Sequence, residues 1–366
     1  MYTHNAKISV HQAKLLLVLQ MFNMSIIILP RIAAKTAGHD GYMLPIAAFI
    51  LGSIYIGVIV SLVNRFPGKD IVEFAPKIVG IPIAVVINTI FAIKLLISAG
   101  FELRMFAEMI SQVLLPNTPL AVIILVMLFT VYYLIKSGAE ASGRMAEVLM
   151  YFVFVPLVMI LILIVIKTDY KQLLPMFQSE PKDFLSGAYY VSLTFVPLEF
   201  LLVLGAIVNK PSKMKGICFF AIGVTSVLEI LIIGLTFTGI GTVETTRQIW
   251  PVLTLMQSVQ LPGSFVENQE ILMMVWWVLS IYMYVSGGIF VASQILSRLA
   301  KFQRENVTVI PLIPIVFFIA MAPGSLVEAY QYFIKFQGIY GIVFLLIVPA
   351  VLLCVAKLRK VGGTGE

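Results

Sequence analysis

The sequence is poor in charge and in the residues that carry metal or thiol chemistry. Charged side chains make up 12% of the 366 residues, whereas a soluble globular domain carries about 25%. Cysteine occurs twice, at Cys218 and Cys354, both inside apolar stretches, and the three histidines have no metal-ligand spacing. The sequence also contains no nucleotide-binding signature and no arrangement typical of a catalytic nucleophile. We therefore expect neither a metal, nor a cofactor, nor an enzymatic activity.

Apolar residues are abundant instead. They account for 60% of the chain, and the mean hydropathy is +1.02. About 20 apolar residues suffice to cross roughly 30 Å of hydrocarbon, and the sequence contains ten candidate stretches. We therefore predict an all-α integral membrane protein with ten transmembrane helices, forming a single transmembrane domain over residues 1–366 with the lipid bilayer as its solvent. The stretches lie near residues 13–33, 44–63, 81–112, 119–136, 147–166, 186–208, 216–240, 270–297, 308–323 and 338–356.

The basic residues indicate how the chain is oriented. The net charge is +7, but the lysines and arginines are spread over short connecting segments, which favours a topology signal over nucleic-acid binding. If the N-terminus is inside, sixteen basic residues lie on inner segments, seven lie on outer segments, and Lys94 and Arg104 lie within the third stretch. This distribution predicts that both termini are cytoplasmic. The glycine-rich tail, residues 361–366, is expected to be disordered.

The ten stretches divide into two halves of five, about 10–167 and 186–356. Since five is odd, the halves cross the membrane in opposite senses, which is the inverted-repeat arrangement of many secondary transporters. The first stretch of each half carries a helix-breaking pattern. One reads "FNMSIIILP", with Asn23, Ser25 and Pro30, and the other reads "SLTFVPLEF", with Pro197 and Glu199. Broken first and sixth helices at matching positions favour a ligand site in the middle of the membrane.

The third stretch contains an unusual density of charge, "GFELRMFAEMI" at residues 100–110. Charge is costly in hydrocarbon, so these side chains should face the interior of the bundle. Arg104 and Glu108 are four residues apart and can pair on one helical face, which we interpret as a structural ion pair. Glu102 has no good partner on its own helix. A partner on another helix, a bound proton, and a ligand or cation all remain open for it.

Other polar residues within the stretches allow several interpretations. Lys94 could extend to the interface, pair with Glu199 or Glu229, or bind an anionic group. Glu229 could form a packing ion pair or belong to a site. Tyr282, Ser286 and Ser293 share one stripe of the eighth stretch, where they could join helices or line a pocket.

Three motifs point to a family. They are "LPR" at 29–31, "FELRMFAEM" at 101–109, and "IWPVLTLMQSVQLPGSFVENQE" at 249–270. Together they resemble the B subunit of GerA-type nutrient germinant receptors of endospore-forming bacteria. The last motif departs from the usual family form at Asn268, where an arginine is common.

The resemblance implies a member of the amino acid/polyamine/organocation superfamily with a leucine-transporter-like fold. It implies location in the spore inner membrane, beside an A subunit and a lipoprotein C subunit. The function it implies is to bind a small nutrient, an amino acid or a similar molecule, within the membrane bundle and to trigger germination. A proton- or cation-coupled amino acid permease is the alternative, because the two functions share a fold.

The resemblance also implies a germinant pocket among the first, third, sixth and eighth stretches. Trp250 and Pro251 begin a short amphipathic helix that we expect to form an outer lid, together with Glu267 and Glu270. The residues that the resemblance places at the pocket are Asn23, Ser25, Lys94, Ser98, Glu102, Val196, Glu199, Tyr282, Met283 and Ser286.

Overall fold

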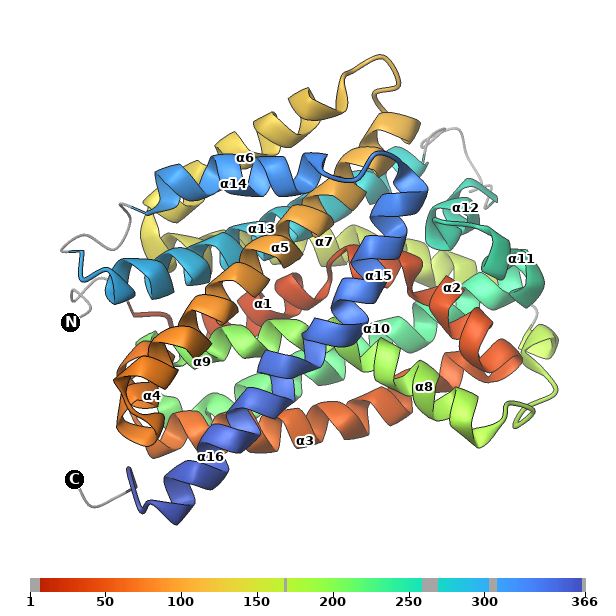
Figure 1. The fold of residues 1–366 in the computed structure, drawn as a ribbon. Helices are drawn as coiled ribbons and strands as arrows, with labels where there is room; N and C mark the ends of the chain where they lie inside the picture. Colours follow the sequence, from red (N-terminus) through yellow and green to blue (C-terminus); the bar gives the residue numbers. More distant parts are fainter. Residues whose placement is uncertain (1–6, 168–169, 259–268, 303–307, 364–366) are drawn as a thin grey trace.

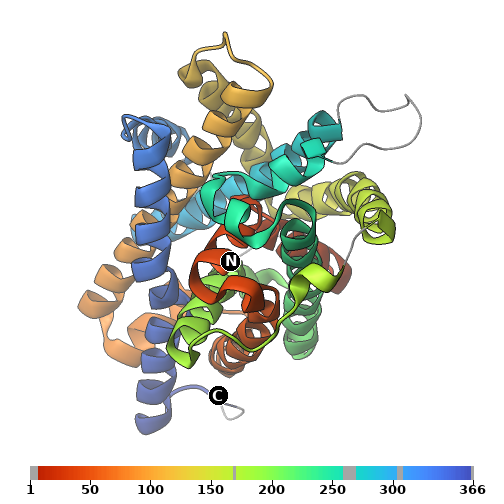
Figure 2. The ribbon, with the colours of Figure 1, turned by 90° about the vertical axis from the view of Figure 1, so that its right-hand side faces the viewer.

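The computed structural model describes residues 7–167, 170–258, 269–302 and 308–363. Within these ranges the chain is helical, and its only extended contact is a parallel bridge between Ile8 and Val208. The helices pack side by side into one bundle (Figure 1 and Figure 2), with α15 and α16 running obliquely across it. This agrees with the predicted all-α class.

The first half of the chain forms seven α-helices and one 3-10 helix. α1 begins with a capping box, in which the Ser9 hydroxyl accepts from the Gln12 amide at 3.1 Å and the Gln12 side chain accepts from the Ser9 amide at 3.0 Å. The elements are α1 (Val10–Met21), α2 (Met24–Ala37), η1 (Gly38–Met43), α3 (Leu44–Arg65), α4 (Ile71–Val79), α5 (Ile81–Val113), α6 (Leu120–Lys136) and α7 (Gly138–Lys167).

The second half mixes longer α-helices with short 3-10 segments and one π-helix. Its elements are η2 (Tyr170–Leu173), α8 (Pro181–Ser192), η3 (Leu193–Phe200), α9 (Leu201–Leu204), η4 (Gly205–Ile207), η5 (Pro211–Lys213), α10 (Met214–Ile240), α11 (Thr242–Arg247), α12 (Pro251–Ser258), α13 (Gln269–Leu299), α14 (Val309–Met321), α15 (Leu326–Ile342), the π-helix η6 (Val343–Ile347) and α16 (Val348–Leu358).

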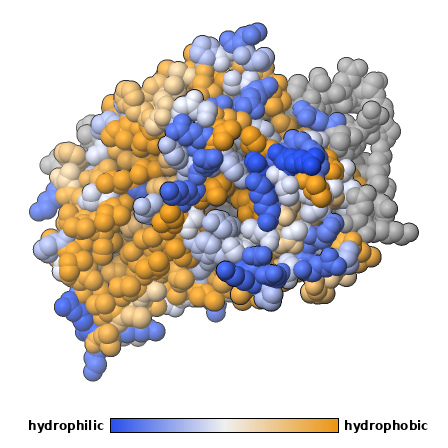
Figure 3. Space-filling view, turned by 45° about the vertical axis from the view of Figure 1, so that its right-hand side comes forward, coloured by the Kyte–Doolittle hydropathy of each residue, from blue (hydrophilic) through white to orange (hydrophobic). Residues whose placement is uncertain are grey.

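Seven helical segments of the described residues are long and apolar enough to cross a membrane. Two further apolar helices, α6 and α14, have 17 and 13 residues. The predicted count of ten spans is not confirmed, because α14 is short and because the first predicted span is divided between α1 and α2. Apolar side chains cover a wide area of the surface (Figure 3), and many lie exposed on α3, α5 and α7, as a lipid-facing surface requires.

The first predicted span is broken at Phe22 and Asn23. α1 ends at Met21, α2 begins at Met24, and the Asn23 side-chain amide donates to the Gln20 carbonyl at 3.3 Å. This bond satisfies one of the carbonyls that the helix end leaves open. The sequence pattern had included Pro30, but Pro30 lies inside α2, one and a half turns or more beyond the break.

The sixth predicted span is interrupted in a different way. After α8 the chain continues as the 3-10 helix η3, which contains Pro197, rather than opening into an unwound segment. The i→i+3 hydrogen bonds of a 3-10 helix keep the backbone groups paired around Pro197, which has no amide hydrogen to donate. Glu199 is therefore presented from a 3-10 helix.

Polar contacts fix the two ends of the bundle. At one end, Arg298 of α13 pairs with Asp70 at 2.6 Å and with Glu73 at 3.0 Å, which fastens α13 to the amphipathic helix α4. At the other, the buried Asp40 carboxylate accepts hydrogen bonds of 2.6–2.9 Å from residues 177–179, which lie just before α8. The start of α1 and the end of α16 lie toward the same end of the bundle (Figure 1).

Candidate ligand-binding site

A buried ion pair joins α5 to η3. Lys94 Nζ donates to Glu199 Oε1 at 2.5 Å, and the two side chains are 5% and 0% exposed. Of the partners left open for Lys94 by the sequence, the structure thus selects Glu199 and not Glu229. A buried pair of this kind couples two helices, because separating it would leave either charge uncompensated in the bundle interior.

Tyr284 of α13 extends this pair into a polar cluster. Its side chain lies among Glu102, Glu199, Ser98 and Gln337, which come from α5, η3 and α15. Glu102 is fully buried, and its neighbours include this tyrosine on a different helix. The cluster joins four elements and brings together Lys94, Ser98, Glu102 and Glu199.

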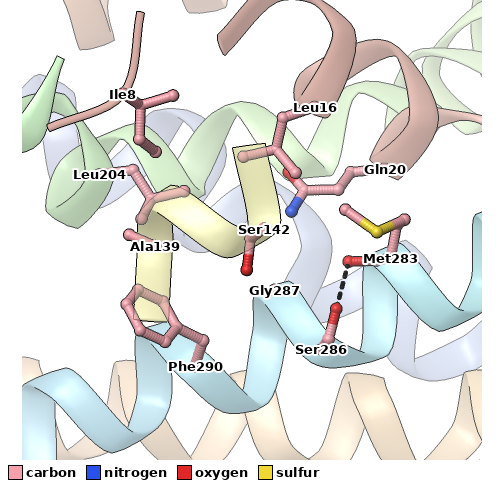
Figure 4. A pocket seen from close by; sticks show the side chains of 10 residues that line it. All are labelled: Ile8, Leu16, Gln20, Ala139, Ser142, Leu204, Met283, Ser286, Gly287 and Phe290. Carbon is pink, nitrogen blue, oxygen red and sulfur yellow. Dashed lines mark hydrogen bonds between the residues drawn. The ribbon is translucent and has the colours of Figure 1, made fainter. Parts of the chain in front are cut away.

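A small, partly open pocket lies beside the end of α1, and α1, α7, α9 and α13 contribute most of its walls. Figure 4 shows Gln20 and Ser286 at this pocket, with the Gln20 amide nitrogen turned toward Gly287. The lining residues are Ile8, Leu16, Gln20, Ala139, Ser142, Leu204, Met283, Ser286, Gly287 and Phe290.

Gly287 makes this geometry possible. A Cβ atom at position 287 would overlap Nε2 of Gln20, whereas a Cβ at Gly288 would lie no closer than 3.7 Å to another group, the Leu95 carbonyl oxygen. Gln20 is 1% exposed, and its Oε1 has no hydrogen-bond partner in the described part of the chain. The buried Gln20 side chain therefore carries a hydrogen-bond acceptor close to the break between α1 and α2.

The remaining predicted site residues are not gathered at one place. Asn23 is buried at the break, and Val196 is buried in η3 beside Gly341 of α15. Met283 and Ser286 line the pocket, but Tyr282 is half-buried and does not line it. The side chains of Ser25 and Glu270, and the whole of Glu267, lie outside the described residues.

The other predicted groups have structural contacts. Arg104 pairs with Glu108 at 2.8 Å and also donates to the Ala320 carbonyl near the end of α14 at 3.2 Å. Ser293 shares a hydrogen bond of 2.8 Å with Thr308, which precedes α14. Ser293, one residue of the polar stripe predicted in the eighth stretch, therefore connects α13 to the start of α14.

The segment between α11 and α13 contains the helix that the sequence predicted. α12 begins at Pro251, directly after Trp250, and Trp250, Val252, Leu255 and Met256 are buried. Leu255 packs onto Gly239 near the end of α10, where a Cβ would collide with it. Its action as a lid stays a prediction.

Sequence reasoning missed Gln20 and Gln337. Each lies in a helix that carries a second glutamine and other polar residues, so nothing in the sequence singled it out. Neither could be assigned to the site until the rotation of α1 and α15 was known.

The fold and this buried charged cluster define a multi-pass membrane protein of the transporter-like class. The fold resembles that of Mhp1, a nucleobase-cation-symport-1 family transporter, in a closed conformation with bromovinylhydantoin bound. The TM-score is 0.72 at 12% sequence identity, covering 98% of this chain and 82% of the transporter. Mhp1 has a leucine-transporter-like fold, and at this identity the likeness concerns the fold alone.

The chain belongs to the spore germination protein family, whose model matches residues 7–328. Its relatives include spore germination protein YndE of Bacillus subtilis (strain 168), which is 23% identical over 365 residues and covers 99% of each chain. Spore germination proteins B2 and A2 of the same organism are 22% and 24% identical and cover 98% and 93% of each chain, respectively. The family is one of permease-like membrane proteins and not of enzymes.

Proposed function

We propose that this chain is the nutrient-sensing B subunit of a spore germinant receptor. It binds a small nutrient, an amino acid or a similar molecule, inside the membrane bundle and passes the signal to an A and a C subunit in the spore inner membrane. Family membership and full-length similarity to proteins A2 and B2 support this role. The ten-helix, 5+5 inverted-repeat topology with cytoplasmic termini belongs to the same proposal.

The observation that carries the proposal is the Lys94–Glu199 pair. It joins α5 to the interrupted sixth span at 2.5 Å, in a bundle where isolated charge is disfavoured. A nutrient with polar or charged groups can compete for either partner. If it binds one arrangement of α5 and η3 more tightly than another, it shifts the population between them, which is what a sensor requires.

The likeness to a transporter fold favours one alternative, a proton- or cation-coupled amino acid permease. In that case the same site would alternate its access across the membrane instead of signalling. The two functions differ in their output. A sensor changes the state of its partner subunits, whereas a permease accumulates its substrate without them.

The deciding experiment deletes the gene and, in parallel, places the purified chain in lipid vesicles. We expect deletion to slow germination toward one set of nutrients and to leave nutrient-independent triggers intact. We expect the vesicles to show no net uptake of those nutrients under proton or sodium gradients. Robust uptake by the chain alone, with normal germination after deletion, would instead establish the permease.

A further inference from the structure

A second buried acid lies apart from the polar cluster, on α10. Glu229 is 0% exposed, and neither carboxyl oxygen has a hydrogen-bond partner of ordinary geometry in the described residues. The ion pairs of the described residues do not include it. A carboxylate without compensation in a membrane interior is strongly disfavoured, so this site needs a bound positive charge or a neutral acid.

The surroundings of Glu229 connect the two interrupted spans. Thr194 of η3 lies beside it, with its own hydroxyl donated to the Val191 carbonyl at 2.8 Å. One turn earlier on the same face of α10, the Thr225 hydroxyl contacts Met21 Sδ at 3.7 Å, and Met21 is the last residue of α1. A change at either interruption therefore changes the environment of Glu229.

Ser226 gives a second, independent sign of a site. It is 5% exposed, its hydroxyl has no hydrogen-bond partner in the described residues, and it stands three residues before Glu229 on α10. Residues three apart are neighbours on a helix surface. Within the described part of the chain, two polar side chains on one turn are thus buried without a hydrogen bond of ordinary geometry, close to both interrupted spans.

Several ionisable groups on the elements packed against α10 have contacts of their own. Lys14 of α1 stacks on the Phe220 ring, 4.9 Å from its centroid, and Phe220 is roughly 13 Å from Glu229 along α10 at 1.5 Å per residue. Arg31 of α2 stacks on Tyr330, Asp40 holds residues 177–179, and the Tyr55 hydroxyl shares a hydrogen bond with Ser192. The other ionisable residues on elements packed against α10 or lying beside Glu229 are His11, Lys35, His39, Tyr42, Arg65, Glu140, Arg144, Glu147, Tyr151, Lys167, Tyr170, Lys171, Glu199, Lys213, Glu244 and Arg247.

We propose that Glu229 is an exchangeable proton site, neutral in this conformation and opened to deprotonation when the interrupted spans move apart. The ligand is a proton, because the carboxyl is fully buried and the described residues contain no group of three or more His, Cys, Asp or Glu side chains that could form a cation shell. Movement of α1 or η3 that admits water stabilises the carboxylate and releases the proton. The conformational equilibrium then depends on pH, and raising the pH favours the conformation in which Glu229 is hydrated.

Infrared spectroscopy of the purified full-length chain in lipid vesicles tests this proton directly and requires no nutrient. We expect the wild type at neutral pH to show a carbonyl stretch of a protonated carboxylic acid that is absent in Glu229→Gln. The matched control is Glu244→Gln, an acid that is 42% exposed on α11, and it should keep the band. A spectrum unchanged by Glu229→Gln would overturn the proposal.

The folding of Glu229 variants also tests whether this carboxyl is neutral. A site that holds a neutral acid accepts neutral replacements, so Glu229→Gln and Glu229→Leu should accumulate and elute as folded protein. Loss of folded protein in both variants would mean that the ionised form is required, which also overturns the proposal.

The coupling of this proton to conformation is tested by the nutrient response of spores, and this part rests on the proposed function. One linked proton shifts the midpoint nutrient concentration by up to about tenfold per pH unit, and Glu229→Gln should flatten that dependence. A full slope in Glu229→Gln spores would show that the proton is not coupled. Failure of the sensing role itself would instead abolish the nutrient response in wild-type and variant spores alike, with the infrared result unaffected.

Discussion

At the scale of single residues, the two ion pairs on α5 differ in what they hold. Arg104 and Glu108 belong to the same helix, and Arg104 also binds the Ala320 carbonyl, so this pair fastens α5 to the end of α14. Lys94 instead reaches across to Glu199 on the interrupted span. The first pair holds α5 in position, whereas the second is the pair at which we propose that the nutrient binds.

Arg104→Met should lower the amount of folded protein. It leaves Glu108 and the Ala320 carbonyl without their donor, and breaking a buried pair costs about 3–5 kcal/mol. Adding Glu108→Gln removes the uncompensated charge and should restore part of the loss. Protein levels in membranes, measured by quantitative immunoblot, check both variants; wild-type levels of the single variant would contradict the structural role.

The sequence anticipated the Arg104–Glu108 pair because four-residue spacing on a helix fixes which side chains are neighbours. It left the partner of Lys94 open, because contacts between helices depend on how each helix is rotated in the bundle. The same reason explains why Gln20 and Gln337 were missed. Periodicity places a residue on a face, but it does not say which neighbour that face meets.

At the scale of elements, α13 is the common wall of the candidate site. One part of its surface carries Tyr284 into the charged cluster, and another carries Met283, Ser286 and Gly287 into the pocket. Gly287 allows Gln20, at the end of α1, to pack directly against the helix backbone. A shift of α1 would therefore be transmitted to α13 by contact.

Gly287→Ala should disturb this contact, because the added Cβ overlaps the Gln20 amide. We expect a lower melting temperature of the purified protein and an altered nutrient midpoint. Gly288→Ala is the matched control, since its Cβ has room and both changes raise helix propensity equally. Equal melting temperatures for the two variants would show that α1 and α13 are not closely coupled here.

The two interrupted helices show how well helix-breaking residues in the sequence predict where and how a helix is interrupted. Asn23 marked the first break correctly, because its side chain caps the Gln20 carbonyl. Pro30 suggested a later position, but membrane helices tolerate an internal proline, and Pro30 lies inside α2. For the sixth span, Pro197 predicted an interruption, yet its 3-10 form depends on packing against α3, α8 and α15, which the sequence does not display.

At the scale of the whole molecule, the predicted ten crossings are an even number, which would place both termini on one side. The distribution of basic residues predicts that this side is the cytoplasm. Reporter fusions after Glu366 and within residues 170–180 should therefore report opposite sides, with the terminal fusion inside. Fusions that report the same side would mean that one crossing has been miscounted.

The sensing role rests on the buried pair between α5 and η3, and the most direct measurement is the nutrient dose response of spores with this chain as their only B subunit. Lys94→Met with Glu199→Gln removes both charges together, so the protein should accumulate normally. Hydrogen bonds to charged groups contribute about 1.5–3 kcal/mol each, which predicts a midpoint at least about tenfold higher, or no response. Arg104→Met with Glu108→Gln removes the other pair on α5 and, normalised to protein level, should leave the midpoint unchanged. A Lys94/Glu199 double variant with normal protein and an unshifted midpoint would contradict a nutrient site at this pair.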